Sequence, residues 1–98
     1  MKNRRVNLPT LKLHTSIAEQ FAKVDEEFFE WKKASSNIES LREIFDLMQA
    51  AKGLLQVAED YAKMFQKCVV DEVEKQHWDK LIKRGWTIEE LQGLSYDK

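Results

Sequence analysis

Residues 25–46, DEEFFEWKKASSNIESLREIFD, carry two acidic pairs on either side of a short polar run. Glu27 and Glu30 are three positions apart, and so are Glu43 and Asp46. Side chains three apart share one side of a helix, and the Ser-Ser-Asn run between the pairs favours a turn or a helix cap. The stretch therefore predicts an antiparallel helical hairpin, in which both pairs lie at the same height, roughly 12 Å from the turn.

Capping signals predict where the helices of this hairpin begin. Ser16-x-x-Glu19 and Ser36-x-x-Glu39 both fit the capping box, in which the two side chains bond each other's backbone N–H. The first helix is expected to start near Thr15 or Ser16 and to stop near Ala34. Its apolar residues repeat at a 4-3-4-3 spacing, which gives one helical face: Ile17, Phe21, Val24, Phe28 and Trp31.

The helical pattern that starts after Ser36 continues to about Lys83. One helix of ~45 residues would be about 68 Å long, far too long for so small a core, so a break is expected. Gly53 and the Glu59-Asp60 stretch are the two candidates, and the second is favoured. Arg84-Gly85 predicts a helix end with glycine at the cap, and Thr87-x-x-Glu90 predicts a last short helix at about 88–91.

Length and composition predict an all-α protein of one domain, residues 1–98. The 98 residues include only three glycines and one proline, and no alternating β-branched run is present. Residues 1–13 are expected to be an extended N-terminal arm, and residues 87–98 a short helix and tail. A chain of this size buries only about two-thirds of its unfolded surface. The expected fold is therefore a small helical bundle, the hairpin plus one or two further helices, completed by oligomerisation.

Charge and cysteine content argue against several classes of protein. A net charge of -1 gives no reason to expect a nucleic-acid or anionic-membrane partner. No apolar run approaches the roughly 20 residues that span a bilayer, and the basic start is followed by no apolar segment of a secretory signal. Cys68, the single cysteine, fits a cytoplasmic protein without disulfides or a thiolate zinc site, and it is expected to be a small buried apolar residue.

The acidic pairs have two interpretations. Three of the four carboxylates have a basic neighbour one helical turn away, as solvated helix faces do: Lys23 for Glu27, Lys33 for Glu30, and Arg42 for Asp46. Glu43 has no such neighbour, and it heads an apolar seam, where an unpaired carboxylate is costly. A metal ion would satisfy Glu43 and offset the repulsion among the crowded acids.

The residue types then indicate which metal. Carboxylate oxygens without Cys or His favour Mg²⁺, with Mn²⁺ possible, over zinc. Mg²⁺ usually keeps waters and takes substrate phosphates as further ligands, and it can polarise a phosphoryl oxygen and activate a water. A di-iron bundle is the chemical alternative, but it needs Glu-x-x-His ligands, and neither His14 nor His77 has that spacing.

The same residues resemble a known family. Glu27-x-x-Glu30, twelve intervening residues and Glu43-x-x-Asp46 are similar to the E-x-x-E…E-x-x-D signature of the all-α MazG-like nucleoside triphosphate pyrophosphohydrolases. The segment 77–85, HWDKLIKRG, resembles the H-x-x-K-L-x-x-R-G ending of many small members. Signature and ending together cover about residues 24–86.

The resemblance implies a Mg²⁺-dependent enzyme that cleaves (d)NTPs between the α and β phosphates, giving (d)NMP and pyrophosphate, for removal of unwanted nucleotides. It implies that Glu27, Glu30, Glu43 and Asp46 hold the metal and that one glutamate orients or deprotonates the attacking water. It further implies that cations at the end of the chain bind the substrate phosphates: Lys80, Lys83 and Arg84.

Small members of the family are dimers or tetramers with helices of two subunits around each site, so the resemblance also implies a homodimer or homotetramer. Apolar residues off the main stripes fit such an interface: Phe29, Phe45, Met48 and Leu55. The sequence departs from the family in one respect, because no acidic or amide residue with a lysine on the next helix matches the usual context. Two alternatives stay open: a non-enzymatic helical interaction or regulatory protein with solvated acidic faces, and a relative that binds nucleotide without hydrolysing it.

Overall fold

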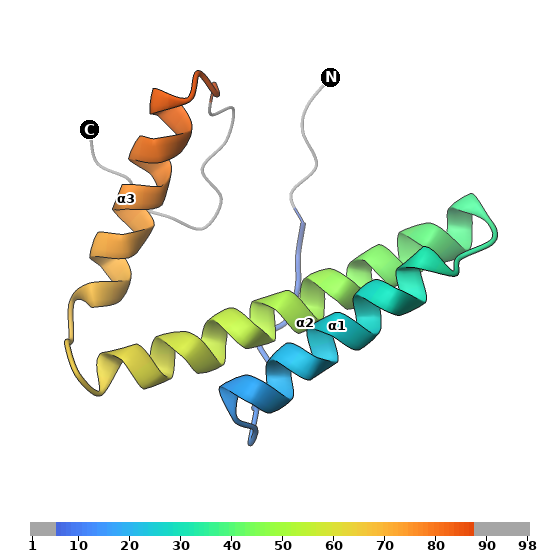
Figure 1. Ribbon diagram of the computed structural model, residues 1–98, viewed down its shortest axis with the longest axis horizontal. Helices are drawn as coiled ribbons and strands as arrows, with labels where there is room; N and C mark the ends of the chain where they lie inside the picture. Colours follow the sequence, from blue (N-terminus) through green and yellow to red (C-terminus); the bar gives the residue numbers. More distant parts are fainter. Residues whose placement is uncertain (1–5, 88–98) are drawn as a thin grey trace.

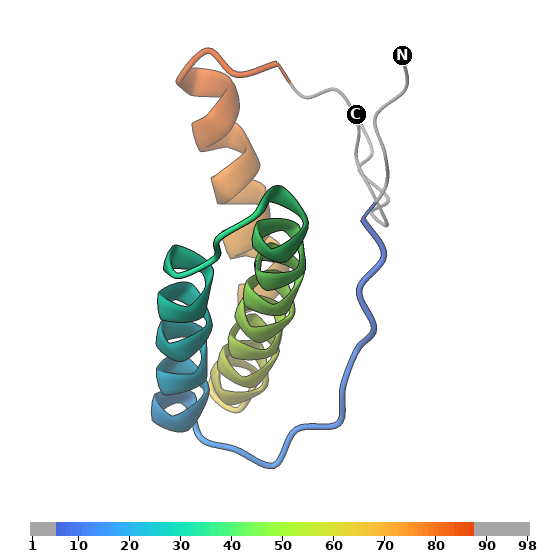
Figure 2. The same cartoon turned by 90° about the vertical axis from the view of Figure 1, so that its right-hand side faces the viewer.

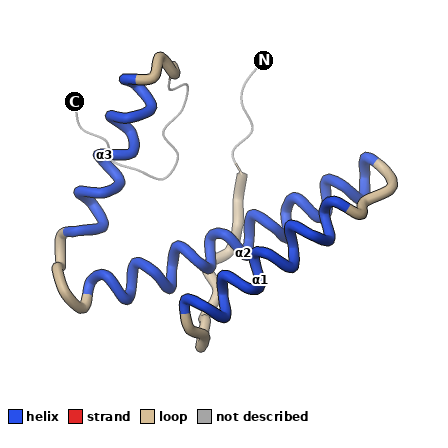
Figure 3. The backbone as a smooth tube through the Cα atoms, viewed as in Figure 1, coloured by secondary structure: helices blue, strands red, loops and turns tan. Residues whose placement is uncertain are grey.

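The computed structural model describes residues 6–87 and shows three helices. They are α1 (Ile17–Lys32), α2 (Asn37–Lys63) and α3 (Val69–Lys83). Helices α1 and α2 lie side by side as an antiparallel hairpin, while α3 leaves the far end of α2 at a steep angle (Figure 1). The described residues outside the helices are loops and turns, without a strand (Figure 3). The prediction of an all-α chain built on a helical hairpin is confirmed.

The predicted capping box is complete at the start of α1 and only partly formed at the start of α2. At α1, the Ser16 hydroxyl accepts the Glu19 N–H at 3.1 Å, and the Glu19 carboxylate accepts the Ser16 N–H at 2.9 Å. At α2, the Ser36 hydroxyl accepts the Glu39 N–H at 3.1 Å. The Glu39 carboxylate, however, accepts the N–H of Ser35 at 2.8 Å. The prediction of a second capping box is therefore only half right. The expected bond from the Ser36 N–H to the Glu39 carboxylate is replaced by a bond from the Ser35 N–H.

The prediction of the break between the second and third helices was wrong. Helix α2 runs without interruption through Gly53 and through Glu59-Asp60, and the chain turns at residues 64–68 instead. No residue in 64–68 forbids a helix, so no local signal marks this turn. The turn lets Val69 and Val73 of α3 fold back toward α2, and it leaves Cys68 exposed, contrary to its expected burial.

Gly53 of α2 lies directly against the Gln20 side chain of α1. A Cβ at this position would be 2.6 Å from Nε2 of Gln20 and 3.1 Å from Cδ1 of Leu13. The Gln20 amide instead donates a 3.1 Å hydrogen bond to the backbone carbonyl of Ala50. Gln20, Ala50 and Gly53 are the buried residues of the described chain. The centre of the hairpin is therefore a close contact between one glutamine side chain and two small residues.

Helix α1 is rotated relative to the expected apolar stripe. Phe21 and Phe28, two members of the stripe, are 60% and 45% exposed. The side that faces α2 carries Gln20, Val24 and Glu27, together with Trp31. Trp31 donates from Nε1 to the Ser40 hydroxyl at 3.0 Å, which ties the two helices together near their turn.

The predicted end of α3 is confirmed. The Gly85 N–H bonds the Ile82 carbonyl at 3.0 Å, and the Trp86 N–H bonds the Leu81 carbonyl at 3.0 Å. This pair of bonds is a Schellman motif, and Gly85 takes the positive φ of 94° that the motif requires. The expected helix at 88–91 lies outside the described residues.

The described part of the N-terminal arm, residues 6–15, is not helical; it runs beside α2, on the side away from α1, before it turns to the start of α1 (Figure 2). Three α2 side chains donate to backbone carbonyls of this arm. Gln49 bonds Pro9 at 2.9 Å, Lys52 bonds Leu8 at 2.8 Å, and Gln56 bonds Leu11 at 2.7 Å. The arm is therefore docked along α2 and is part of the fold.

Candidate metal centre

Three of the four predicted carboxylates meet between α1 and α2. One carboxylate oxygen each from Glu27, Glu43 and Asp46 lies within 4.8 Å of the others. Glu27 comes from α1 and the other two from the antiparallel α2. The symmetric spacing about the turn therefore has the predicted effect for these three residues.

The helix faces explain why the carboxylates converge. The Glu27 side chain, on the side of α1 that faces α2, is only 13% exposed. Glu43 is half-buried opposite it, and Asp46 is exposed at the rim. Facing positions of two packed helices normally carry apolar side chains, so a pair of carboxylates there needs a positive partner.

Glu30 does not join the group of three. Its carboxylate lies 3.9 Å from the Lys33 amine in an exposed ion pair. Glu30 is near enough for its charge to act on Glu43. The four-residue cluster that the sequence predicted is thus a three-residue cluster here, with Glu30 beside it.

The charges in the cluster are only partly balanced. Partial removal from water, followed by the repulsion of Asp46 and Glu27 and then of more distant carboxylates, raises the pKa of Glu43. The Lys23 amine lies 2.9 Å from Glu27 and 3.1 Å from Glu26, and these bonds raise the pKa of Lys23. Lys23 neutralises Glu27. Glu43 instead has other carboxylates beside it, in agreement with the lack of a basic residue among its helical neighbours in the sequence.

The donor set fits a small hard cation. All three groups are carboxylates, the ligand type that Mg²⁺ and Mn²⁺ prefer. In octahedral Mg²⁺ with Mg–O bonds of about 2.1 Å, neighbouring ligands are about 3.0 Å apart and opposite ligands about 4.2 Å apart. The three oxygens, which lie within 4.8 Å of one another, would have to move closer by side-chain rotation to share one ion. Three ligands leave further positions for water or phosphate.

The predicted phosphate-binding cations lie elsewhere in the chain. Lys80 and Lys83 belong to α3 and Arg84 caps its end, and all three are exposed. Helix α3 contacts α2 but not α1. Within one chain, the described structure does not bring these cations to the carboxylates.

A groove beside the carboxylates was not predicted from the sequence. It has a volume of about 620 Å³ and is bounded by the arm, α1 and α2. Glu27 and Asp46 form one end of it, and Lys23 lies at that end as well. The sequence carried no signal for the groove, because the arm was expected to be extended but its position on α2 could not be inferred.

Comparison with known proteins gives no relative on which to rest a function. No family model matches the chain, and no significant match was found among curated proteins or solved structures. In the part of the chain that the structure describes, no helix combines the length and the apolar character required to cross a bilayer.

Proposed function

We propose that this protein is a Mg²⁺-dependent nucleoside triphosphate pyrophosphohydrolase, with Glu27, Glu43 and Asp46 as metal ligands. The observation that carries the proposal is the convergence of these three carboxylates across the helical hairpin. The E-x-x-E…E-x-x-D resemblance supplies the reaction, which is hydrolysis between the α and β phosphates. Glu30, beside the cluster, is the fourth ligand in this proposal once its weak ion pair with Lys33 opens.

The residues of the site have complementary roles in such a reaction. Bound Mg²⁺ would supply charge neutralisation and polarisation of a phosphoryl oxygen. In this proposal one glutamate of the cluster orients the attacking water or accepts its proton. Water attacks the α phosphorus, the bond to the bridging oxygen breaks, and pyrophosphate leaves. Lys23, which now pairs with Glu27, would be available to neutralise phosphate charge if Glu27 held the metal.

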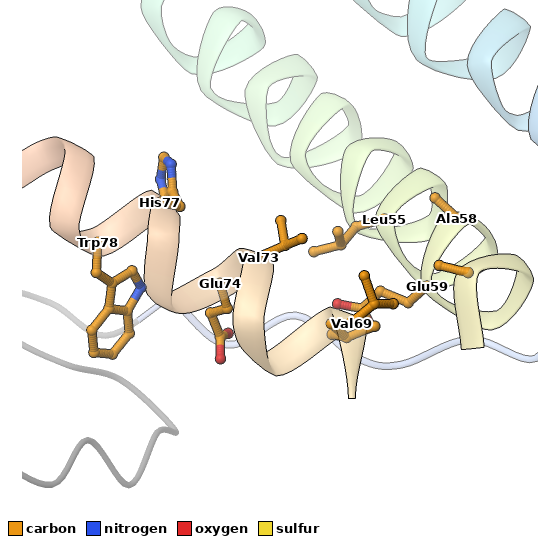
Figure 4. A pocket seen from close by; sticks show the side chains of 10 residues that line it. Leu55, Ala58, Glu59, Val69, Val73, Glu74, His77 and Trp78 are labelled. Carbon is orange, nitrogen blue, oxygen red and sulfur yellow. The ribbon is translucent and has the colours of Figure 1, made fainter. Parts of the chain in front are cut away.

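A homodimer or homotetramer belongs to this proposal. Leu55, Tyr61 and Val73 are 58%, 55% and 54% exposed, although they are large apolar residues of α2 and α3. A hollow of about 460 Å³ separates the two helices, with Leu55 and Val73 facing each other across it (Figure 4). Exposed apolar area of this kind marks interaction surfaces. A second subunit docked there could also bring the cations of its own α3 to the carboxylate cluster of the first subunit.

The same surface supports the alternative function, a helical interaction or regulatory protein. In that case the exposed faces of α2 and α3 would bind a different protein, and the carboxylates would be ordinary acids. The two functions differ in their metal dependence. A regulatory protein has no need of Mg²⁺, while the proposed hydrolase is inactive without it.

Asp46→Asn, with Asp60→Asn as its matched control, tests the proposal. Both aspartates are exposed on α2, and only Asp46 belongs to the cluster. We expect Asp46→Asn to weaken Mn²⁺ binding, measured by paramagnetic resonance or calorimetry, and to reduce Mg²⁺-dependent pyrophosphate release by at least a hundredfold. Asp60→Asn should change neither. Equal behaviour of the two variants, or no pyrophosphate release from any nucleotide of a ribo- and deoxynucleotide panel, would reject the proposed function.

A further inference from the structure

Four charged residues of α3 form a row of alternating sign, which we call the charge stripe. Asp71, Lys75, Asp79 and Lys83 follow one another at intervals of four positions. Residues four apart lie on the same side of a helix, about 6 Å apart along its axis. All four residues are exposed. Along one side of α3 the stripe therefore presents negative, positive, negative and positive charge in turn.

Within the described residues the charge stripe has no partner. Its members do not line the hollow between α2 and α3, and α3 does not contact α1. Oppositely charged residues four apart can form ion pairs, but in the part of the chain that the structure describes none of the four does so. No residue of α3 is buried, and an isolated helix of 15 residues is marginal in water. Helix α3 therefore has room for a further helix, and the stripe is open to it.

We propose that the charge stripe pairs with the charge stripe of a second copy of this chain, with the two α3 helices antiparallel. In this orientation Asp71 lies opposite Lys83 of the second copy, and Lys75 opposite its Asp79. The two-fold symmetry of the pair repeats each contact, so all four positions meet an opposite charge. A parallel pair would place equal charges opposite each other. The order of the signs therefore selects the antiparallel pair.

Helix geometry allows the two stripes to run along each other. A row of residues four apart is inclined to the helix axis, and two such rows align when the helices cross at about 50°, the commonest crossing in globular proteins. Exposed ion pairs add little affinity, so apolar contacts must contribute. Trp78 and Ile82 each follow a stripe residue by three positions and therefore border the stripe. Ile82 is 54% exposed and Trp78 is half-buried.

This pairing does not depend on the proposed hydrolase. The stripe contains no member of the carboxylate cluster. Of the three α3 cations that the resemblance assigns to substrate phosphates, only Lys83 belongs to the stripe, while Lys80 and Arg84 lie outside it. Because the stripe and the hollow are separate surfaces, a chain that associates through both forms an assembly larger than a dimer.

Charge reversal in the full chain tests the pairing. An acidic variant carries Lys75→Glu and Lys83→Glu, and a basic variant carries Asp71→Lys and Asp79→Lys. Both are made in a Leu55→Asp parent, which keeps association through the hollow out of the measurement. By sedimentation over a range of concentrations, we expect the parent to dimerise and each reversed variant to associate about tenfold more weakly or worse, because every ion pair becomes a repulsion. An equimolar mixture of the two variants should associate as tightly as the parent.

Lys63→Glu with Lys67→Glu, in the same parent, is the matched control. It changes the net charge as the acidic variant does, at two exposed lysines outside α3, and should leave association unchanged. Circular dichroism checks that each variant keeps its helix content, and a variant that had lost α3 would not regain association on mixing. The proposal is overturned by a parent that stays monomeric at millimolar concentration, by an equal loss in the control, or by a mixture that associates no better than its two components.

Discussion

The two helix junctions of this molecule are built in opposite ways. The α1–α2 hairpin is held by directional contacts: the Gln20 amide on the Ala50 carbonyl, the Trp31 indole on the Ser40 hydroxyl, and a close approach at Gly53. The α2–α3 corner instead surrounds a hollow lined mainly by small and branched apolar side chains, together with Glu59, Glu74, His77 and Trp78 (Figure 4).

The difference shows which junction can position a site. Hydrogen bonds fix distance and angle, so the hairpin holds α1 and α2 in one register, and in that register Glu27 meets Glu43 and Asp46. Apolar contacts are not directional, and the corner leaves large side chains in water. The hairpin is therefore the part suited to chemistry, and the corner the part suited to association.

The largest expected effect comes from a charge placed in the corner. Leu55→Asp should weaken self-association at least tenfold, because a carboxylate in an apolar interface is costly to desolvate. Ile38→Asp is the control, since Ile38 is also an exposed apolar residue of α2, 62% exposed, but lies outside the corner. Sedimentation over a range of concentrations measures the effect. A chain that stays monomeric before any substitution would show that the corner binds something else or nothing.

A second prediction concerns the contact between Gly53 and the Gln20 side chain. Alanine normally stabilises a helix interior relative to glycine by about 1 kcal/mol. Here its Cβ would displace the buried Gln20 amide from the Ala50 carbonyl, and a buried polar group left without its partner costs about 1–3 kcal/mol; the Cβ would also crowd Leu13. We expect Gly53→Ala to lower the free energy of unfolding by about 1 kcal/mol, and to raise it in a Gln20→Ala background. Urea denaturation of the four proteins measures this coupling, and additive effects would contradict it.

Trp31→Phe tests the second directional contact of the hairpin. The variant keeps the ring that packs on Phe28, 5.8 Å away between centroids, but loses the bond to the Ser40 hydroxyl. A loss of about 1 kcal/mol in unfolding free energy is expected. Trp86→Phe, at a position 67% exposed, should change it by less than about 0.5 kcal/mol. Similar losses in both variants would mean that the bond does not stabilise the hairpin.

The smallest expected effect is on the pH dependence of folding stability, in which the carboxylate cluster and the helix caps act in different pH ranges. The pKa of Glu43 is raised, so the folded metal-free protein binds its proton more tightly than the unfolded chain, and stability falls as pH rises through a range above the ordinary 4.5. The capping bonds lower the pKa of Glu19 and Glu39, so their stabilisation is lost as pH falls below 4.5.

Thermal unfolding across pH 3–8 measures both effects. Glu43→Gln should remove the slope above 4.5 and leave the loss at lower pH in place. Saturating Mg²⁺ should also diminish the upper slope, because the cation offsets the repulsion. A slope above 4.5 that survives Glu43→Gln would assign the effect to another group.

Several features were predictable because their causes are local. Ser16 and Glu19 cap a helix through atoms three residues apart, and Gly85 ends α3 because its φ is positive. The isolation of Glu43 from cations was visible in its helical neighbours, and its raised pKa agrees. The polar run at 35–37 predicted the hairpin turn, and with it the approach of Glu27 to Glu43 and Asp46.

Other features depend on contacts between distant residues, and no local pattern indicated them. The face of α1 turned to α2 is set by Gln20 reaching Ala50, thirty residues away, rather than by the apolar stripe. The turn at 64–68 contains no breaker and follows from the packing of α3 against α2. Glu30 pairs with Lys33 and does not join the other three carboxylates.

The sequence by itself determined the helices, their caps and the placing of the acidic pairs about a turn, because these follow from backbone geometry within a few residues. The tertiary structure decided which carboxylates meet, where α2 ends and how the arm closes a groove beside them. Those outcomes depend on which distant side chains fill the same space. The contact of Gln20 with Gly53 fixes how α1 lies on α2. The hydrogen bonds from three α2 side chains fix where the arm lies on α2.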